Sequence, residues 1–153
     1  MLQRIYVDTS VIGGYFDHEF MEFSKPLFDN VKKGKIKILY SEVTEDELVK
    51  APEKVKQLIK DLPVKNVEFL NLSDEVVRLA ETYVKEGVVG KTSYTDCLHI
   101  ALATINKADV LASWNFKHIV NLCRIRGYNS VNLKLGFGII EIRSPKELMN
   151  YEE

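Results

Sequence analysis

The sequence has little cysteine, no excess of charge of either sign and no long apolar run. Its two cysteines, Cys97 and Cys123, match no metal-binding spacing and lie in apolar-rich segments, which predicts reduced thiols in the core of a cytoplasmic protein. Lys and Arg total 21 against 22 Asp and Glu, so the chain lacks the basic excess of a general nucleic-acid binder. No segment resembles a membrane span or a signal peptide, and we expect no membrane partner.

What the chain does have is a regular alternation of apolar and amphipathic segments. Its 153 residues are 46% hydrophobic, enough for one domain over residues 1–153. Strands are expected at residues 2–7, 36–40, 67–70, 109–112 and 138–142. Helices are expected at residues 9–18, 24–33, 44–50, 53–61, 74–86 and 93–106, within 117–134, and after Pro145. Strands that alternate with helices predict an α/β fold with a parallel sheet covered on both faces.

An acidic residue follows the first predicted strand. Asp8 directly ends the apolar run Ile5-Tyr6-Val7, and open parallel sheets bind ligands outside the carboxyl ends of their strands. Asp is also a favoured N-cap residue, so Asp8 suits the start of the following helix equally well. This residue alone leaves both interpretations open.

A second acidic segment, SEVTEDEL at residues 41–48, follows the second predicted strand. Thr44 and Glu47 have the spacing of a capping box, and Glu45 and Asp46 suit the first turn of a helix. Only Glu47 precedes an apolar pair, so Glu47 is the acid expected to point inward.

A third acid, Asp96, lies near the start of the almost wholly apolar segment at 93–106. A helix that is apolar all round is buried. Ser93 and Asp96 again have capping-box spacing. His99, one turn after Asp96, is interpreted either as a histidine satisfied in the core or as a residue that orients Asp96.

Three carboxylates at one edge of a sheet would repel one another and raise each other's pKa unless a cation lies among them. Carboxylate oxygens are the ligands that Mg²⁺ and Mn²⁺ prefer. The pattern therefore predicts a divalent-metal site formed by Asp8, Glu47 and Asp96.

The fourth predicted strand offers two further candidates, Asp109 and Asn115. A strand rises by about 3.3 Å per residue, so Asp109 lies roughly 13 Å before the end of its strand. Asp109 is therefore expected at the opposite edge of the sheet, and Ser113 and Asn115 at the edge that carries the acids.

The segments YVDTSVIGGYF, SEVTEDEL, YTDCLHIALA and ADVLASWNFKHI resemble, in order and spacing, the successive acidic motifs of PIN-domain proteins. The branch that they most resemble is the VapC-like toxins of type II toxin–antitoxin pairs. The similarity runs along almost the whole chain, through IRSPKEL. It implies a three-layer α/β/α sandwich around a parallel sheet of about five strands, and metal-dependent ribonuclease chemistry.

The resemblance assigns roles residue by residue. The first three acids of the family fall on Asp8, Glu47 and Asp96, and its fourth position falls on Asn115, which leaves the site less negative than a fourth acid would. Thr9 and Ser113 occupy the positions of supporting hydroxyls. The implied reaction uses Mg²⁺ (or Mn²⁺) to hydrolyse RNA, leaving a 5′-phosphate and a 3′-hydroxyl.

Other residues suggest contacts. Lys91 and Lys117 are placed to touch RNA phosphates, as is His118, whereas Trp114 is expected to pack beneath its loop. The resemblance also implies a small antitoxin protein as partner and a homodimer of the chain.

Two other functions are compatible with parts of the pattern. A non-catalytic PIN-like module that binds RNA or a partner is favoured by the asparagine at position 115. An enzyme that transfers phosphate through an Asp8 nucleophile is suggested by a strand-terminal Asp beside Thr9, although no second acid follows two residues later.

Overall fold

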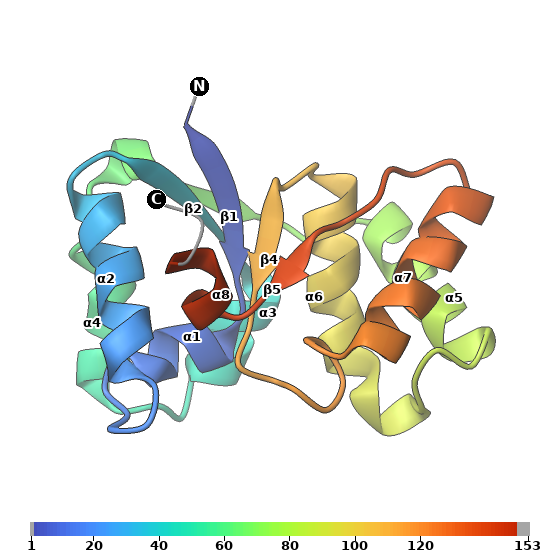
Figure 1. Ribbon diagram of the computed structural model, residues 1–153, viewed down its shortest axis with the longest axis horizontal. Coiled ribbons are helices and arrows are strands. Elements are labelled where there is room, and N and C mark those ends of the chain that lie inside the picture. The colour runs from blue at the N-terminus through green and yellow to red at the C-terminus, as the bar shows by residue number, and fades with distance from the viewer. Residues whose placement is uncertain (1, 150–153) are drawn as a thin grey trace.

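The computed structural model describes residues 2–149 and has a five-stranded parallel sheet at its centre (Figure 1). The strands are β1 (Gln3–Val7), β2 (Ile36–Ser41), β3 (Val67–Leu70), β4 (Val110–Ala112) and β5 (Ile142–Arg143). Their order is β3-β2-β1-β4-β5, and every neighbouring pair is parallel. This arrangement confirms the expected α/β/α fold class.

Helices cover both faces of the sheet (Figure 1). They are α1 (Thr9–Gly14), α2 (Met21–Lys32), α3 (Glu42–Leu48), α4 (Glu53–Lys60), α5 (Asp74–Lys85), α6 (Tyr94–Ile105), α7 (Leu122–Lys134) and α8 (Pro145–Met149), with short 3-10 helices η1 (Val64–Asn66) and η2 (Lys91–Ser93). The layer on one face contains α1, α2 and α4, and the layer on the other contains α5, α6 and α7. Within residues 2–149, no helix is long and apolar enough to cross a membrane.

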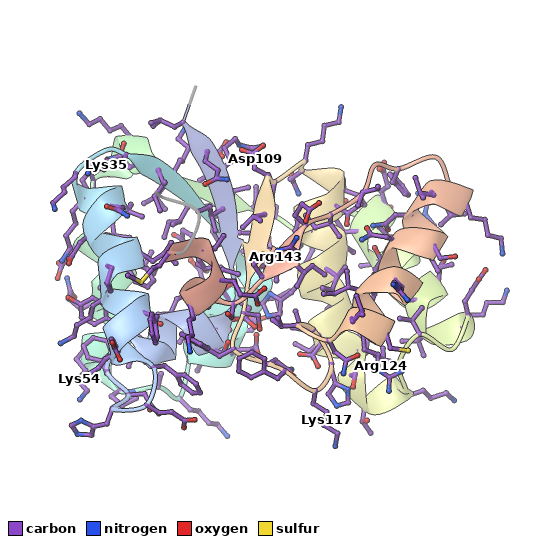
Figure 2. All side chains as sticks on the ribbon, viewed as in Figure 1. Lys35, Lys54, Asp109, Lys117, Arg124 and Arg143 are labelled. Atoms are coloured by element: carbon purple, nitrogen blue, oxygen red, sulfur yellow. The ribbon has the colours of Figure 1, made fainter. Side chains whose placement is uncertain are left out.

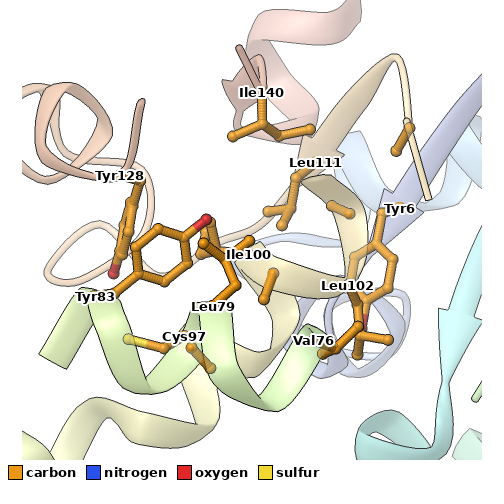
Figure 3. Close-up of a cluster of buried hydrophobic side chains, with 14 of the residues drawn as sticks. Tyr6, Val76, Leu79, Tyr83, Cys97, Ile100, Leu102, Leu111, Tyr128 and Ile140 are labelled. Atoms are coloured by element: carbon orange, nitrogen blue, oxygen red, sulfur yellow. The ribbon is translucent and has the colours of Figure 1, made fainter. Parts of the chain in front are cut away.

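Alternation along the central strands builds two cores, because successive side chains of a strand point to opposite faces. Ile5 and Val7 of β1 pack with the first layer, whereas Tyr6 between them packs with the second. Tyr6 lies in register with Leu39 and Leu111 on the neighbouring strands. Figure 3 shows the second core, where Tyr6 and Leu111 meet side chains from α5, α6 and α7. Burial on both faces explains why the strands read as continuous apolar runs.

The first helix is shorter than predicted. The segment expected to be helical at residues 9–18 is α-helical only to Gly14. Beyond it, the N–H of Tyr15 donates to the carbonyl of Ile12 in a tighter turn. A Cβ on Gly14 would lie 2.7 Å from Ser24 Oγ and 2.8 Å from Trp114 Nε1. The glycine thus permits a close approach of α1 to neighbouring segments, and the chain turns away there.

The last strand is also misplaced in the prediction. The strand expected at residues 138–142 occupies only Ile142–Arg143. The reason is a side chain: Asn129 Oδ1 accepts from the N–H of Ile140 at 2.8 Å, and Asn129 Nδ2 donates to its carbonyl at 3.1 Å. Because α7 satisfies these backbone groups, Ile140 has no need of a strand partner.

The prediction for the cysteines is half right. Cys97 is a buried free thiol on α6, as expected. Cys123 is a free thiol too, but it is exposed on the first turn of α7. Its apolar neighbour Leu122 is exposed as well, at 66%, so an apolar-rich segment does not guarantee burial here.

Candidate active site

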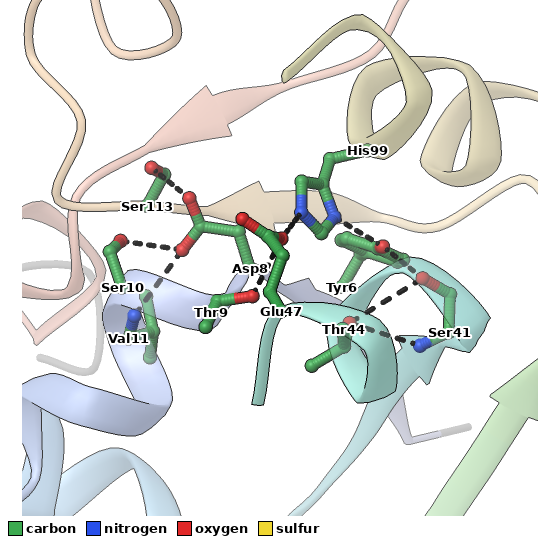
Figure 4. Close-up of polar contacts among 10 residues, drawn as sticks. All are labelled: Tyr6, Asp8, Thr9, Ser10, Val11, Ser41, Thr44, Glu47, His99 and Ser113. Carbon is green, nitrogen blue, oxygen red and sulfur yellow. Dashed lines mark hydrogen bonds and ion pairs between the residues drawn. The ribbon is translucent and has the colours of Figure 1, made fainter. Parts of the chain in front are cut away.

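The proposed site lies where the order of the strands reverses. From β1 the chain continues to β2 on one side, and β4 lies on the other side of β1. Asp8 directly follows β1, and Ser113 directly follows β4. Their side chains meet in the gap between the two strand ends (Figure 4). This is the position at which open parallel sheets bind ligands.

Three donors hold the carboxylate of Asp8. Ser113 Oγ donates to Oδ2 at 2.5 Å, Ser10 Oγ donates to Oδ1 at 2.6 Å, and the N–H of Val11 donates to Oδ1 at 3.2 Å. The contact with Val11 makes Asp8 the N-cap of α1. The capping interpretation of Asp8 is therefore confirmed. The same carboxylate lies at the strand ends, where its role as a ligand-binding residue stays a prediction.

Burial decides the ionisation of Asp8. The residue is only 4% exposed, and burial raises its pKa because the charged form loses hydration. The charge that His99 carries when protonated, and the donors from Ser10, Ser113 and Val11, oppose this rise without cancelling it. A nearby cation would therefore favour the ionised form of Asp8.

Glu47 comes from the last turn of α3. The helix begins with a capping box formed by Ser41 and Thr44, rather than by Thr44 and Glu47 as their spacing suggested. The difference arises because the helix starts at Glu42, which makes Thr44 its third residue. Glu47 is therefore not needed for capping, and its side chain reaches toward the strand ends.

A chain of hydrogen bonds fixes Glu47 (Figure 4). Thr9 Oγ1 donates to Glu47 Oε1 at 2.8 Å, and His99 Nε2 lies 2.6 Å from the same oxygen. His99 Nδ1 lies 2.6 Å from the hydroxyl of Tyr6, which lies 2.8 Å from Ser41 Oγ. All contacts are satisfied when Nε2 carries the proton of His99 and the hydroxyl of Tyr6 donates to Nδ1. His99 is thus satisfied in the core, and it orients Glu47 rather than Asp96.

Glu47 and Asp8 differ in their electrostatics. Partial burial would raise the pKa of Glu47, but the hydrogen bond and charge of His99, together with the Thr9 donor, outweigh it and lower that pKa. The side chain of Glu47 is 38% exposed. Glu47 is therefore an ionised carboxylate that remains accessible from solvent.

Asp96 lies in the first turn of α6, one turn before His99. Ser93 is the N-cap of this helix but makes no side-chain capping bond, so the predicted capping box is absent. Burial raises the pKa of Asp96, the charges of Asp8 and Glu47 raise it further, and His99 and His118 oppose them. The negative charges of Asp8 and Glu47 thus both act on the carboxyl group of Asp96. Within residues 2–149, no hydrogen bond holds its carboxylate.

These residues fit a divalent cation by donor type and by charge. All three are oxygen donors, and the mutual effect on Asp96 is the repulsion that a bound cation relieves. The side chains are not preorganised around a metal ion. Among residues 2–149, no three Asp, Glu, His or Cys side chains are already gathered at ligating distance. Glu47 Oε1 already forms hydrogen bonds with Thr9 and His99.

The loop after β4 places the remaining candidates. Asn115 Oδ1 accepts from the N–H groups of Lys117 and His118 at 3.1 and 2.9 Å, which closes a turn. Trp114 is buried beneath the loop, as expected, and stacks on Phe20 with ring centroids 4.4 Å apart.

Asp109 lies at the other edge of the sheet, as the strand geometry predicted. It precedes β4, and its Oδ2 accepts from the N–H of Arg4 at 2.7 Å. Figure 2 shows Asp109 and Lys35 on the amino-end side of the sheet, and Lys54, Lys117 and Arg124 on the carboxyl-end side. Lys91 and Lys117 are both exposed.

Sequence reasoning missed Tyr6 and Ser10 as parts of this site. Ser10 bridges the two strand ends, because its Oγ donates to Asp8 and accepts from the N–H of Trp114 at 2.9 Å. The spacing Asp8-x-Ser10 is a local signal that could have revealed it. Tyr6 connects to His99 from 93 positions away, and no local pattern signals such a contact.

The family model for the PIN domain matches residues 5–117. The chain belongs to the PIN-domain family. The matched part of this PIN domain contains the proposed site residues from Asp8 to Lys117 and ends one residue before His118. No curated protein matches the chain.

Solved structures share the fold of this PIN domain at low sequence identity. DNA-bound VapBC from Salmonella typhimurium has a TM-score of 0.58 at 15% identity, over 95% of this chain and 99% of that one. VapBC2 from Rickettsia felis, bound to a fragment of its promoter, has a TM-score of 0.57 at 13% identity, over 93% and 98%. VapC20 from Mycobacterium tuberculosis, a toxin that cleaves the sarcin–ricin loop, has a TM-score of 0.57 at 13% identity, over 74% and 91%.

Proposed function

We propose that this PIN domain is a metal-dependent endoribonuclease and the toxin of a toxin–antitoxin pair. The observation that carries the proposal is the geometry at the carboxyl ends of the strands, where Ser10 and Ser113 orient the carboxylate of Asp8, and Thr9 and His99 orient that of Glu47. Helix capping accounts for only the Val11 contact of Asp8 and for no contact of Glu47. Fold similarity to VapC20, which cleaves an RNA loop, supports RNA as the substrate class.

The cofactor in this proposal is Mg²⁺ or Mn²⁺, held by Asp8, Glu47 and Asp96. When bound, such an ion supplies polarisation of the scissile phosphodiester and a lowered pKa for a water molecule. The protein supplies the rest. Ser10 and Ser113 fix the direction of Asp8, and Thr9 and His99 fix that of Glu47.

Each of the three acids has a different role in the proposed reaction. Asp8 is buried and held by three donors, so it is the fixed ligand. Glu47 is ionised and accessible, which suits orientation of the attacking water. Asp96 has no hydrogen bond that holds it within residues 2–149, and its carboxylate can turn toward the cation. The amide N–H groups of Asn115 are the donors available to a substrate phosphate.

Burial argues against the phosphotransfer alternative. A nucleophilic carboxylate must reach the phosphorus atom, yet Asp8 is 4% exposed and both of its oxygens accept hydrogen bonds. These properties suit a ligand of a cation better than a nucleophile.

The proposed partners are a small antitoxin and a second copy of this chain. A toxin–antitoxin complex from Klebsiella pneumoniae is among the structures that share the fold, with a TM-score of 0.54 at 16% identity. Co-purification from the native host tests the antitoxin, and light scattering at high concentration tests the homodimer. Recovery of no small protein, or a monomeric mass, would contradict the respective claim.

The function itself is tested by metal dependence. Purified protein should cleave single-stranded RNA in Mn²⁺ or Mg²⁺, lose this activity in EDTA and regain it when the metal is restored. Asp8→Asn should lower the rate by about 100-fold or more, since even residues that only support metal ligands commonly cost 10- to 100-fold. Products should carry 5′-phosphates.

Two results would contradict the proposal. Cleavage that persists in EDTA would contradict the requirement for a metal ion. Binding of RNA and Mn²⁺ without cleavage of any RNA would favour the non-catalytic module instead.

A further inference from the structure

The turn that follows β4 is tied directly to the proposed active site. Ser113 Oγ, which donates to Asp8, also accepts from the N–H of Asn115 at 2.9 Å. Asn115 Oδ1 then accepts from the N–H groups of Lys117 and His118, and its carbonyl accepts from Ile119 and Val120. The position of the turn relative to Asp8 is therefore set by consecutive hydrogen bonds.

Phe116 lies at the tip of this turn and is 53% exposed. Its ring contacts Trp114 edge to face, with centroids 6.2 Å apart and an angle of 63° between the planes. Trp114 itself is immobilised, because its Nε1 donates to Ser24 Oγ at 2.9 Å and its ring stacks on Phe20. Phe116 thus has a rigid aromatic support on one side and water on the other.

Positive charge accompanies this exposed ring. Lys117 is the next residue, and it is exposed as well. Figure 2 shows Lys117, Lys54 and Arg124 on the side of the molecule where the strands end. Lys54 lies far from Lys117 in this view, and its Nζ is 5.2 Å from the ring centroid of Phe16. Because the net charge of the chain is only -1, the neighbouring cation Lys117 is what can attract a polyanion to Phe116.

We propose that Phe116 and Lys117 form a base-stacking subsite that selects an unpaired nucleotide of the RNA beside the scissile phosphate. A free aromatic face stacks on any unstacked base, and the neighbouring cation neutralises the backbone. This inference rests on the proposed ribonuclease function and adds the two residues that hold the nucleotide next to the scissile phosphate.

The test combines cleavage kinetics with a stacking signal. The probe is a single-stranded oligoribonucleotide with one 2-aminopurine, a base whose fluorescence falls when it stacks on an aromatic ring. Phe116→Leu should raise the KM for cleavage in Mn²⁺ by about 10-fold, within the range measured when a stacking ring is removed. It should leave kcat within about 2-fold and abolish the quenching. Phe116→Tyr should restore both.

Two further variants make the test specific. Phe69→Leu is the matched control, because Phe69 is 41% exposed on the edge strand β3 and lies outside the site; it should behave as wild type. Lys117→Gln should lower the salt dependence of binding by about 0.7 in the slope of log K against log[salt], the value for one phosphate contact with a single strand. The duplex form of the same oligonucleotide should bind and react more weakly.

The outcomes separate this inference from the function on which it rests. Wild type that cleaves RNA, with Phe116→Leu unchanged in KM and in quenching, overturns the subsite and leaves the ribonuclease standing. Wild type that neither cleaves nor binds RNA overturns both. Normal cleavage by Phe116→Leu together with loss of antitoxin binding assigns the turn to a protein interface and overturns the inference.

Discussion

Acidic residues occur at both edges of the central sheet, and the two edges treat them differently. At the amino-end edge, Asp109 accepts from the N–H of Arg4 at 2.7 Å, and Arg4 Nε donates to Glu68 at 2.8 Å. Arg4 Nη1 also donates to the carbonyls of Asn106 and Lys107 at 3.0 Å. Asp109, Glu68 and Arg4 at this edge thus each have a partner of opposite sign or a backbone group.

At the carboxyl-end edge the acids have no such cation. Within residues 2–149, no Lys or Arg side chain forms an ion pair with Asp8, Glu47 or Asp96. Hydroxyl groups hold Asp8, and a hydroxyl and an imidazole hold Glu47. The result is a raised pKa at Asp8 and at Asp96.

This contrast separates the acids that the fold compensates with Arg4 from the acids that have no Lys or Arg partner. The amino-end edge even borders a cavity of about 430 Å³, lined by Ile5, Asp109 and Arg143 among others, but its acids are already compensated. The proposed site therefore coincides with acids that lack a cationic partner and not with this cavity.

The largest expected effect separates the two edges by activity. Asp96→Asn should lower RNA cleavage by about 100-fold or more, because it removes an oxygen ligand of the proposed cation. Asp109→Asn is the matched control, and it should retain wild-type activity, since its amide oxygen still accepts from Arg4. Single-turnover cleavage in Mn²⁺ measures both. Equal losses in the two variants would erase the distinction between the edges.

A smaller effect is expected at His99. His99→Phe keeps a ring in the core but removes both nitrogens, leaving Tyr6 and Glu47 each without one partner. Stability should fall by about 1–3 kcal/mol, the usual cost of an unsatisfied buried group. The pKa of Glu47 should rise, since His99 is the main group that lowers it.

Denaturant unfolding and an NMR titration of the Glu47 carboxyl carbon test this prediction. His18→Phe, at an exposed position on the same chain, is the control and should change neither quantity. An unchanged pKa at Glu47 in His99→Phe would mean that the hydrogen bond between them has no electrostatic role.

The smallest effect concerns the stability of the metal-free protein. Because the pKa values of Asp8 and Asp96 are raised in the folded state, the folded protein binds more protons than the unfolded one, and the free energy of unfolding falls as pH rises above their ordinary value. Glu47, whose pKa is lowered, acts only at lower pH, where its stabilisation is lost by protonation. Asp96→Asn should flatten the decline and stabilise the protein near pH 7 by up to about 1 kcal/mol, the scale of a single charge interaction.

Thermal melts in EDTA between pH 5 and 8 compare this variant with wild type. The helix-capping interpretation of Asp96 predicts the opposite sign, because an acid in the first turn stabilises a helix. A variant that melts lower at every pH would therefore mean that Asp96 acts on α6 rather than on the other acids.

Much of the fold follows from local patterns in the sequence. The runs that contain Ile5 and Val7, or Ile38 and Leu39, are buried on both faces and read correctly as strands of a parallel sheet. The argument from strand length placed Asp109 at the correct edge. These successes share a cause, since periodicity and rise per residue are properties of the segment itself.

The errors come from contacts between segments distant in sequence. The misplaced strand near Ile140 depends on the side chain of Asn129. The partner of His99 is Glu47 on another helix, although Asp96 lies closer in the sequence. The capping box at α3 begins at Ser41 because β2 ends there, a boundary that spacing alone does not reveal. Tertiary packing decides each of these, so single-sequence patterns do not contain it.

The central claim is that Asp8, Glu47 and Asp96 form one divalent-metal site, and a crystal soaked in Mn²⁺ tests it most directly. An anomalous difference map should show a peak within ligand distance of carboxylate oxygens of Asp8 and Asp96, and the peak should be absent from crystals of Asp96→Asn soaked in the same way. A map with no peak at these carboxylates, or with equal peaks in both crystals, would contradict the account.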